Sequence, residues 1–267
     1  MAAEVPGPRT PTERRRRIVD EARRAGGFIT VAALGDRLKV SLMTIRRDII
    51  AMERAGEVQR TRGGVLVPSL QVMLVEPPFR QRETINAVAK QAIAATAAAL
   101  AESGQTIGVD VGTSTLALCP YLASIGQLTV ITTSLPAASN LAAAIEVYLP
   151  AGRVRAHELS LVGSTARDGV ARYHYDLVFI GVAALNEDGC YDYSIEDTEI
   201  KHALIHNAQR VVVLCDASKF GRLAAVTVAK LDSITTLVTD RTPPTGVGSA
   251  LAEAGVEVLL AGAGDAR

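Results

Sequence analysis

The chain has 267 residues, 48% of them hydrophobic and 21% charged, which is enough to bury a core and to form two domains. This composition excludes collagen-like, disulfide-scaffold and strongly disordered proteins. The 28 basic and 28 acidic residues cancel, but they are segregated: residues 1–67 hold 14 basic and 8 acidic side chains, which leaves 14 and 20 for the remainder. A basic head therefore precedes an acidic body, and we expect a polyanionic partner for the head.

Neither the cysteines nor the apolar segments indicate an exported or membrane protein. Cys119, Cys190 and Cys215 are odd in number and far apart, so neither a disulfide framework nor a paired-cysteine zinc site is expected. No apolar stretch of signal-peptide length follows Arg14–Arg17, and no apolar segment reaches the roughly 20 residues that span a bilayer. We expect a cytoplasmic protein without a membrane partner.

Residues 1–11 contain three prolines and little to bury, which predicts a disordered tail. Three helices are expected after it. Thr12, Thr30 and Ser41 are placed to cap the first, second and third of these helices, because a side-chain oxygen ahead of an apolar helical pattern accepts hydrogen bonds from the first turn. The third helix has apolar residues at near-helical intervals, at Ile45, Ile49 and Met52.

Glu57–Val67 predicts two short strands that turn on Gly63-Gly64, a β-hairpin. Three helices and a hairpin within residues 12–67 are typical of a winged helix-turn-helix domain. Residues 68–79 hold three further prolines and show no period, so we expect a linker there.

From residue 80 to residue 267 the pattern is that of an α/β domain. An alanine-rich helix is expected at 90–101, and further helices at 116–122, 136–144 and 196–209. Seven apolar runs predict strands, and most are continuous, as in strands buried on both faces. These runs are Thr106–Val109, Leu128–Thr132, Val147–Leu149, Leu177–Ile180, Val211–Leu214, Thr236–Val238 and Val256–Leu260. The second domain is therefore predicted to contain a largely parallel sheet.

The third helix of the head carries the candidate DNA contacts. Thr44, Arg46 and Arg47 lie in its first two turns, the end that enters the major groove in a helix-turn-helix protein. Guanidinium groups pair with guanine there, so Arg46 and Arg47 are candidate groove contacts. Ser41 and Thr44 are candidates for the helix cap and for a phosphate contact.

The alternative is that Arg46, Arg47 and Asp48 form a solvated helix face. The turn, the capped helix and the basic hairpin, with Arg60 and Arg62, agree with one another and favour DNA binding.

Residues 14–67 resemble the N-terminal domain of the DeoR-type transcriptional regulators. The matching motifs are Val40-Ser41 in the turn, Thr44-Ile45-Arg46-Arg47-Asp48 on the recognition helix, Met52-Glu53 at the helix end and Arg60-Thr61-Arg62-Gly63-Gly64 in the wing. One departure is Arg62, where the family usually has histidine, and it adds a fixed positive charge to the wing.

Two hydroxyl-rich loops that follow strands predict an anion site in the second domain. Glycine permits close backbone approach, hydroxyls donate hydrogen bonds, and a helix start supplies free amides, so phosphate is the favoured ligand. Both loops should open at the carboxyl ends of parallel strands, where α/β sheets bind ligands. The candidate residues are Asp110, Gly112, Thr113, Ser114 and Thr115 in the first loop and Thr132, Thr133 and Ser134 in the second. The alternative for the first loop is an ordinary strand-to-helix turn. Neither loop is a P-loop, so a nucleotide is not implied.

A third segment, Asp216–Gly221, follows the run Val211–Leu214. Lys219 is placed to neutralise a ligand phosphate, and Asp216 to accept a hydrogen bond from a sugar hydroxyl. The alternative is a turn with a solvated lysine.

Residues 80–240 are similar to the DeoR-type C-terminal sensor domain, which is related in fold to ribose phosphate isomerases and CoA transferases and binds phosphorylated sugars or related intermediates. The matching landmarks are Lys90, Asp110–Thr115, Val130–Leu135, Phe179-Ile180-Gly181, Gly189 and Asp216–Gly221. Thr133 and Ala151 depart from the family, which usually has asparagine and glycine there. This resemblance implies a phosphorylated effector, without naming the sugar.

His202 and His206 are four residues apart on a predicted helix, which can place two imidazoles on one face. No His-Glu-x-x-His motif accompanies them, so no metal site is expected. Asp197, Glu199 and Lys201 beside them are interpreted as either a rim of the ligand pocket or an oligomer contact.

The sequence predicts a DNA-binding transcriptional regulator, a repressor of carbohydrate or related metabolic genes, that releases operator DNA when a phosphorylated sugar-like effector binds. One winged head makes few base contacts, so we expect a homodimer or homotetramer. No cofactor and no catalytic residue are expected. The alternative is a sugar-phosphate isomerase or transferase with an appended nucleic-acid-binding head, for which Asp110, Asp216, Glu199 and Lys219 are the groups at hand.

Overall fold

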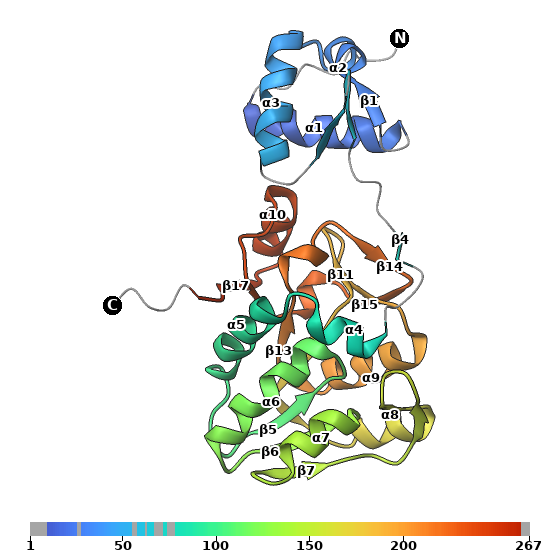
Figure 1. The fold of residues 1–267 in the computed structure, drawn as a ribbon, viewed down its shortest axis with the longest axis vertical. Helices are drawn as coiled ribbons and strands as arrows, with labels where there is room; N and C mark the ends of the chain where they lie inside the picture. Colours follow the sequence, from blue (N-terminus) through green and yellow to red (C-terminus); the bar gives the residue numbers. More distant parts are fainter. Residues whose placement is uncertain are drawn as a thin grey trace, which may run out of the picture. The chain divides into compact units, whose positions relative to one another are not determined.

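A computed structural model describes residues 10–25, 28–54, 58–61, 63–66, 72–73 and 78–262 (Figure 1). The chain divides into two compact units, residues 1–71 and 72–267. Several predicted features lie outside the described residues: most of the tail, most of the linker and the candidate contact Arg62.

Within its described residues, the first unit contains three helices and a small antiparallel sheet with strand order β1-β3-β2. The elements are α1 (Pro11–Arg24), β1 (Phe28–Thr30), α2 (Val31–Leu38), α3 (Leu42–Arg54), β2 (Gln59–Thr61) and β3 (Gly64–Leu66). The predicted winged helix-turn-helix is thus confirmed. The sequence pattern did not predict β1, a three-residue strand that pairs with β3.

Two of the three predicted helix caps are formed in the first unit. The prediction for Thr12 was wrong, because Thr12 lies within α1 and it is Thr10 Oγ1 that accepts a hydrogen bond from the Glu13 amide at 3.1 Å. Thr30 Oγ1 accepts a hydrogen bond from the Ala33 amide at 3.1 Å, and Ser41 Oγ accepts one from the Thr44 amide at 3.3 Å. The apolar stripes of the three helices then meet in one core. Its fully buried members include Ile18, Leu34, Ile45, Ile49 and Met52.

The second unit is built on a seven-stranded parallel sheet with strand order β17-β16-β13-β10-β5-β6-β7. These strands are β5 (Thr106–Val109), β6 (Thr129–Thr132), β7 (Glu146–Tyr148), β10 (Tyr175–Gly181), β13 (Ala208–Leu214), β16 (Thr236–Thr239) and β17 (Glu257–Leu260). Each corresponds to one of the seven apolar runs. The predicted α/β fold with a parallel sheet is therefore confirmed.

Helices cover both faces of this sheet (Figure 1). One face packs against α5 (Ala87–Ala98), α6 (Thr113–Ile125) and α7 (Leu135–Leu141), and the other against α8 (Ser164–Val170), α9 (Ile195–His206) and α10 (Thr245–Glu253). The central strand β10 is buried along almost its whole length because it contacts both layers. A strand in that position needs a continuous apolar run, as its sequence has.

Smaller elements complete the second unit. They are β4 (Val72–Met73), α4 (Phe79–Thr84), β8 (Arg153–Arg155), β9 (Ser160–Val162), β11 (Ala184–Leu185), β12 (Cys190–Asp192), β14 (Leu223–Ala224) and β15 (Val226–Ala229), with short 3-10 turns at Ala217–Lys219 and Leu231–Ser233. The sequence pattern predicted none of them. β4 lies within the segment predicted as a linker and pairs with β14.

Candidate functional site

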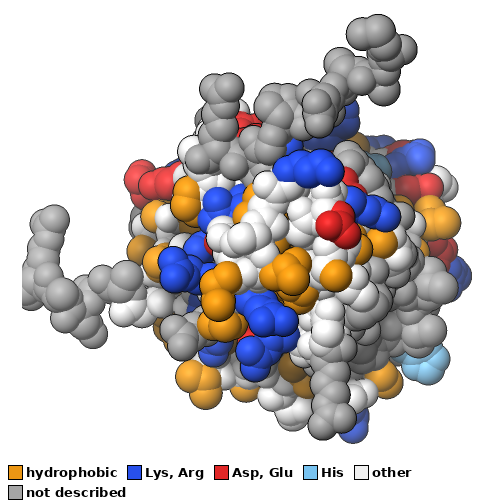
Figure 2. Space-filling view, turned by 90° about the horizontal axis from the view of Figure 1, so that it is seen from above, with side chains coloured by type: hydrophobic (Ala, Val, Ile, Leu, Met, Phe, Trp, Pro, Cys, Tyr) orange, Lys and Arg blue, Asp and Glu red, His pale blue; other side chains and the backbone are white. Residues whose placement is uncertain are grey.

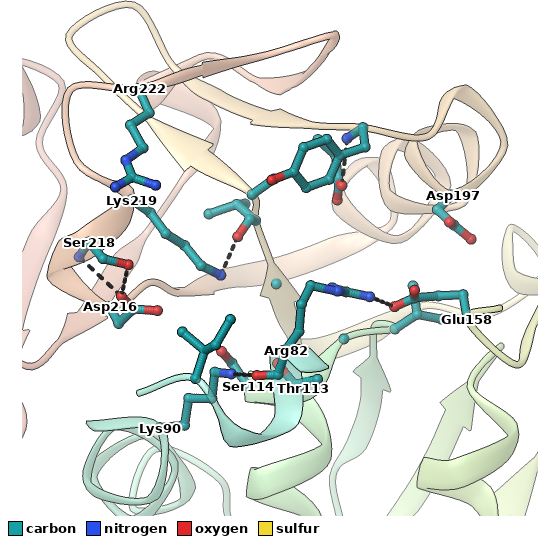
Figure 3. Close-up of a pocket in the computed structure, with 18 residues that line it drawn as sticks. Arg82, Lys90, Thr113, Ser114, Glu158, Asp197, Asp216, Ser218, Lys219 and Arg222 are labelled. Atoms are coloured by element: carbon teal, nitrogen blue, oxygen red, sulfur yellow. Dashed lines mark hydrogen bonds and ion pairs between the residues drawn. The ribbon is translucent and has the colours of Figure 1, made fainter. Parts of the chain in front are cut away.

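A cavity of about 150 Å³ opens in the second unit beyond the carboxyl ends of β5 and β10 (Figure 3). This is the edge at which open parallel sheets bind ligands. Its walls come from residues 111–114 after β5, from the last residue of β10 and the two that follow it, and from four residues after β13, namely Asp216, Ser218, Lys219 and Arg222. Arg82 from α4 and Lys90 from α5 add positive charge to them.

The start of α6 forms one wall of the cavity. Gly112 has φ 140°, a conformation that favours glycine, and it lets the chain turn from β5 into the helix. Thr113 and Ser114 follow as the first residues of α6, where backbone N–H groups have no partner within the helix and the helix dipole is positive. Ser114 is 3% exposed, and its hydroxyl has no hydrogen-bond partner. An unsatisfied hydroxyl and helix-end amides together favour an anion.

Two lysines reach the same cavity from other elements (Figure 3). Lys90 Nζ donates a hydrogen bond to the carbonyl oxygen of Arg82, and Lys219 Nζ donates to the carbonyl oxygen of Val182 at 2.6 Å. Both acceptors are neutral. Burial and the neighbouring charge of Lys219 lower the pKa of Lys90 to about 8. An anion close to Lys90 would oppose both effects and favour the charged lysine.

Asp216 is the carboxylate beside these lysines. Its Oδ1 accepts hydrogen bonds from the amide of Ser218 at 3.0 Å and from Asn86 Nδ2 at 2.9 Å. Burial opposes its ionisation, but the charge of Lys219 and the hydrogen bonds from Ser218 and Asn86 outweigh burial and lower the pKa of Asp216. The carboxylate is therefore ionised at neutral pH.

The opposite wall is a network of buried ionic contacts. Glu158, whose side chain is 4% exposed, pairs with Arg82 and lies 3.9 Å from Arg155. Asp197 pairs with Arg155 at 2.5 Å and accepts a hydrogen bond from Ser160 Oγ at 2.9 Å. This wall offers carboxylate oxygens, which accept hydrogen bonds from hydroxyl groups.

A buried ion pair holds the loop after β5 against β10. Lys201 Nζ contacts Asp110, donates to the carbonyl oxygen of Gly181 at 2.9 Å and lies 3.2 Å from Asp192 Oδ2. Burial raises the pKa of Asp110 to about 6, although Lys201 acts in the opposite direction. Burial likewise opposes the charge on Lys201, but Asp110 and Asp192 outweigh it and raise the pKa of Lys201. This pair supports the loop that carries Gly112 and Ser114.

The structure separates the predicted ligand residues into two groups. Gly112, Thr113, Ser114 and Lys219 line the cavity. Five others are buried and do not line it: Asp110, Thr115, Thr132, Thr133 and Ser134.

Two of these buried residues have local partners of their own. Thr115 Oγ1 donates to the Gly112 carbonyl at 3.0 Å, and Ser134 Oγ caps α7 by accepting from the Ala137 amide at 3.2 Å. The first hydroxyl-rich loop therefore borders the cavity through Gly112, Thr113 and Ser114, whereas the second does not line it.

Several cavity residues were not singled out from the sequence. They are Arg82, Glu158, Asp192 and Arg222. Arg222 directly follows the predicted segment Asp216–Gly221, so extending that segment by one residue would have included it among the candidates. Of the residues interpreted as a rim or an oligomer contact, Asp197 lines the cavity, whereas Lys201 is 1% exposed.

The candidate DNA contacts lie on α3 in the first unit. Arg46 and Arg47 are exposed, and the hydroxyls of Ser41 and Thr44 hydrogen-bond to each other at 2.9 Å. Asp48 is 2% exposed and pairs with Arg14 of α1, so it is absent from the solvent-facing side of the helix. The structure thus leaves two arginines, without the neighbouring carboxylate, on the exposed face of α3.

Arg60, the described wing candidate, is on β2. Its guanidinium lies 3.6 Å from Glu53 near the end of α3, and its side chain is 56% exposed. An exposed pair of this kind contributes little to stability, and the guanidinium stays accessible to a competing phosphate. Figure 2 shows basic side chains spread among hydrophobic and uncharged ones, with separate groups of acidic side chains as well.

The sequence predicted neither a metal site nor a membrane-spanning helix. Among the described residues, no group of three or more His, Cys, Asp or Glu side chains is placed to hold a metal ion. His202 Nε2 lies 3.2 Å from the carbonyl oxygen of Thr227 instead. The described helices include none long and apolar enough to cross a membrane.

A helix-turn-helix unit and an α/β unit with a cation-lined cavity, joined in one chain, are the parts of a ligand-responsive transcriptional regulator. The model of the DeoR-like helix-turn-helix domain matches residues 14–71, and that of the DeoR C terminal sensor domain matches residues 85–241. The chain therefore belongs to the DeoR family of transcriptional regulators, as the motifs in its sequence indicated.

Similar proteins include regulators from archaea and bacteria. The HTH-type transcriptional regulator GlpR of Haloferax volcanii is 34% identical, over 93% of this chain and 97% of that protein. The HTH-type transcriptional repressor GlcR of Bacillus subtilis is 32% identical, over 87% of this chain and 92% of that protein. Ribose 5-phosphate isomerase A from Methanocaldococcus jannaschii shows only a loose structural likeness, with a TM-score of 0.38, 21% identity and coverage of 51% of this chain and 55% of that chain.

Proposed function

We propose that this chain is a repressor that binds operator DNA through α3 and the β2–β3 hairpin, and that a phosphorylated sugar-like metabolite in the cavity releases it. Arg46 and Arg47 are the proposed base contacts, with Ser41, Thr44, Arg60 and Arg62 beside them on the DNA backbone. The repressors among its relatives support the sign of regulation. We place its action in the cytoplasm, where DNA is accessible.

The buried hydroxyl of Ser114 is the observation that supports a phosphate most strongly. It has no partner, it lies at the positive end of α6, and it shares the cavity with Lys90 and Lys219. A buried polar group without a partner costs about 1–3 kcal/mol, which a ligand oxygen would recover. A phosphate there would meet a hydroxyl donor, helix-end amides and two ammonium groups.

The rest of the effector is proposed to be rich in hydroxyl groups. Asp192 and Asp197 both line the cavity, Asp197 on the side away from Lys90 and Lys219 (Figure 3), and their carboxylates accept hydrogen bonds. An unphosphorylated sugar would lose the charged contacts, and a bare phosphate would lose the carboxylate contacts. The cavity therefore favours a molecule that carries both groups.

We propose binding without turnover. Isomerisation needs a base that is free to take a proton from carbon. Each cavity carboxylate has a cationic or amide partner instead: Glu158 pairs with Arg82, Asp192 with Lys201 and Asp197 with Arg155, and Asp216 accepts a hydrogen bond from Asn86. An assay that detects interconversion of a sugar phosphate by the purified protein would contradict this proposal.

Release follows from linkage between two sites. The protein is proposed to have one form with high and one with low affinity for DNA. An effector that binds more tightly to the second form lowers the affinity for DNA, and the limit of this effect is the ratio of the effector's affinities for the two forms. One winged head buries a small surface on DNA, so we propose that a dimer or tetramer reads repeated half-sites.

A thermal-shift series tests the cavity. Sugar phosphates, the matching free sugars and inorganic phosphate are compared on the wild type, Ser114→Ala and Ser124→Ala. Ser124 is a matched control, since it is an exposed serine at the far end of the same helix. We expect one or more sugar phosphates to stabilise the wild type, with about tenfold weaker binding to Ser114→Ala and unchanged binding to Ser124→Ala. Equal binding to all three proteins would contradict the phosphate site.

A further inference from the structure

The exposed face of α3 carries two apolar side chains between its arginines. Met43 is 70% exposed and Ile50 is 37% exposed. The helix repeats every 3.6 residues, so Met43, Arg46, Arg47 and Ile50 share one face, with the two apolar residues along its middle and an arginine to either side. We call these four residues the α3 stripe.

The opposite face of α3 accounts for the orientation of the stripe. Ile45, Asp48, Ile49 and Met52 are each at most 2% exposed and face the core or α1. The pairing of Asp48 with Arg14 adds a polar contact that opposes rotation of α3 about its axis. The position of the α3 stripe is therefore fixed by packing.

Leu42, next to Met43, shows that exposure alone does not define the stripe. It is 46% exposed, but its Cδ2 packs against Gly35 of α2. The contact is so close that a β-carbon added to this glycine would lie 2.7 Å from Leu42 Cδ2. Leu42 thus packs in the turn between α2 and α3. Met43 has its side chain in solvent.

The chemistry of the stripe suits one partner. The middle of a solvent-facing helix surface is ordinarily polar, whereas here it is apolar and bordered by guanidinium groups. In the major groove the single apolar group that a base pair presents is the methyl group of thymine, and guanine presents the acceptors that arginine binds. We infer that Met43 reads a thymine methyl group in the operator, next to a guanine bound by Arg46 or Arg47.

A second copy of this chain fits the α3 stripe less well. Two stripes packed face to face would bring Arg46 and Arg47 of one copy close to the same residues of the other. Like charges in contact oppose association, and a DNA phosphate backbone attracts them. Charge therefore favours DNA as the occupant.

This inference rests on the proposed function, because it assumes that α3 enters the major groove. It adds a prediction about sequence preference that the arginines alone do not make. Ile50 lies two turns further along α3, roughly 10 Å from Met43, and so faces a different base pair.

The test begins with selection of preferred duplexes from a random library by the full-length wild-type protein. Each thymine of the selected site is then replaced singly by deoxyuridine, which removes the methyl group and keeps the base pair. We expect about fourfold weaker binding at one thymine position, the value of one buried methyl group. In Met43→Gln the thymine and deoxyuridine duplexes should bind equally, and in Met43→Leu the preference should persist.

A matched control removes an exposed apolar side chain elsewhere. Val154 of β8 is 45% exposed on the second unit, so Val154→Gln should keep the wild-type preference for thymine. The inference is overturned if the wild type binds thymine and deoxyuridine duplexes equally at every position, or if the preference survives in Met43→Gln. It is also overturned if Met43→Gln changes the oligomeric state in sedimentation while the preference stays. Failure of the wild type to select any sequence would instead contradict the proposed function itself.

Discussion

The charge state of Lys90 sets a pH range for effector binding. With a lowered pKa of about 8, Lys90 is charged below that pH and neutral above it in the free protein. A sugar phosphate is already doubly charged in this range, since its second pKa is about 6. An anion beside Lys90 favours the charged lysine, so binding is strongest below pH 8 and is lost as pH rises through it.

We therefore predict that effector affinity falls by up to about tenfold per pH unit above pH 8. Calorimetric titrations at several pH values measure this slope directly. Lys90→Arg supplies a cation that stays charged over the whole range, so its affinity should be nearly independent of pH. The same slope in both proteins would show that Lys90 is not the group responsible.

Asp48 is a second residue whose role can be measured. It is 2% exposed on α3 and pairs with Arg14 and Arg15 of α1, so its removal breaks the polar contact between the two helices. We predict that Asp48→Ala lowers the free energy of unfolding of the first unit by about 2 kcal/mol, as followed by urea denaturation. Asp36→Ala is the control, because Asp36 is exposed on α2. An equal effect of the two substitutions would contradict this role.

At the scale of elements, α4 and the β8–β9 hairpin meet at the cavity through one ion pair. Glu158, between the two strands of the hairpin, neutralises Arg82 of α4 where a ligand phosphate or hydroxyl would approach. In the proposed site, Glu158 would therefore compete with an anionic ligand for the same guanidinium group.

Removing this competitor should strengthen anion binding. We predict that Glu158→Gln binds inorganic phosphate about fivefold more tightly than the wild type in calorimetry, because the substitution removes the negative charge that Glu158 places beside Arg82. Glu196→Gln is the control, since Glu196 pairs with Arg153 on the surface at 2.5 Å and does not line the cavity. Unchanged or weaker phosphate binding by Glu158→Gln would show that Glu158 does not compete.

The elements that could be predicted from the sequence are those with a strong local signal. The seven strands of the parallel sheet have apolar runs, and α2 and α3 have a capping hydroxyl followed by a helical apolar pattern. The loop at Gly112–Ser114 was also predicted, because a glycine and hydroxyls after a buried strand indicate a turn into a helix.

The elements that could not be predicted depend on contacts between distant segments. β4 and β14 have two residues each and exist through pairing with each other across the second unit. Arg82 and Glu158 are 76 residues apart, and neither has a local motif that reveals its partner. Likewise, nothing near Thr132–Ser134 in the sequence shows that these hydroxyls are buried away from the cavity.

At the scale of the whole molecule, the net charge of zero is the sum of a basic N-terminal part and an acidic remainder, which interact with anions in different ways. The first 67 residues have an excess of six basic side chains, which supports binding to DNA over long range. The remainder has an excess of six acidic ones, so an anion there must be held by local groups. Ser114, Lys90 and Lys219 supply such groups within one cavity.

The most direct test of the proposed repressor measures DNA affinity with and without effector. The selected duplex is titrated with the full-length protein by fluorescence anisotropy, in the presence and absence of a sugar phosphate that stabilises it in the thermal-shift series. We predict at least about fivefold weaker DNA binding with the effector for the wild type, and full DNA binding without that response for Ser114→Ala at the same effector concentration. DNA affinity that is unchanged by every sugar phosphate bound in the cavity would contradict the proposed function.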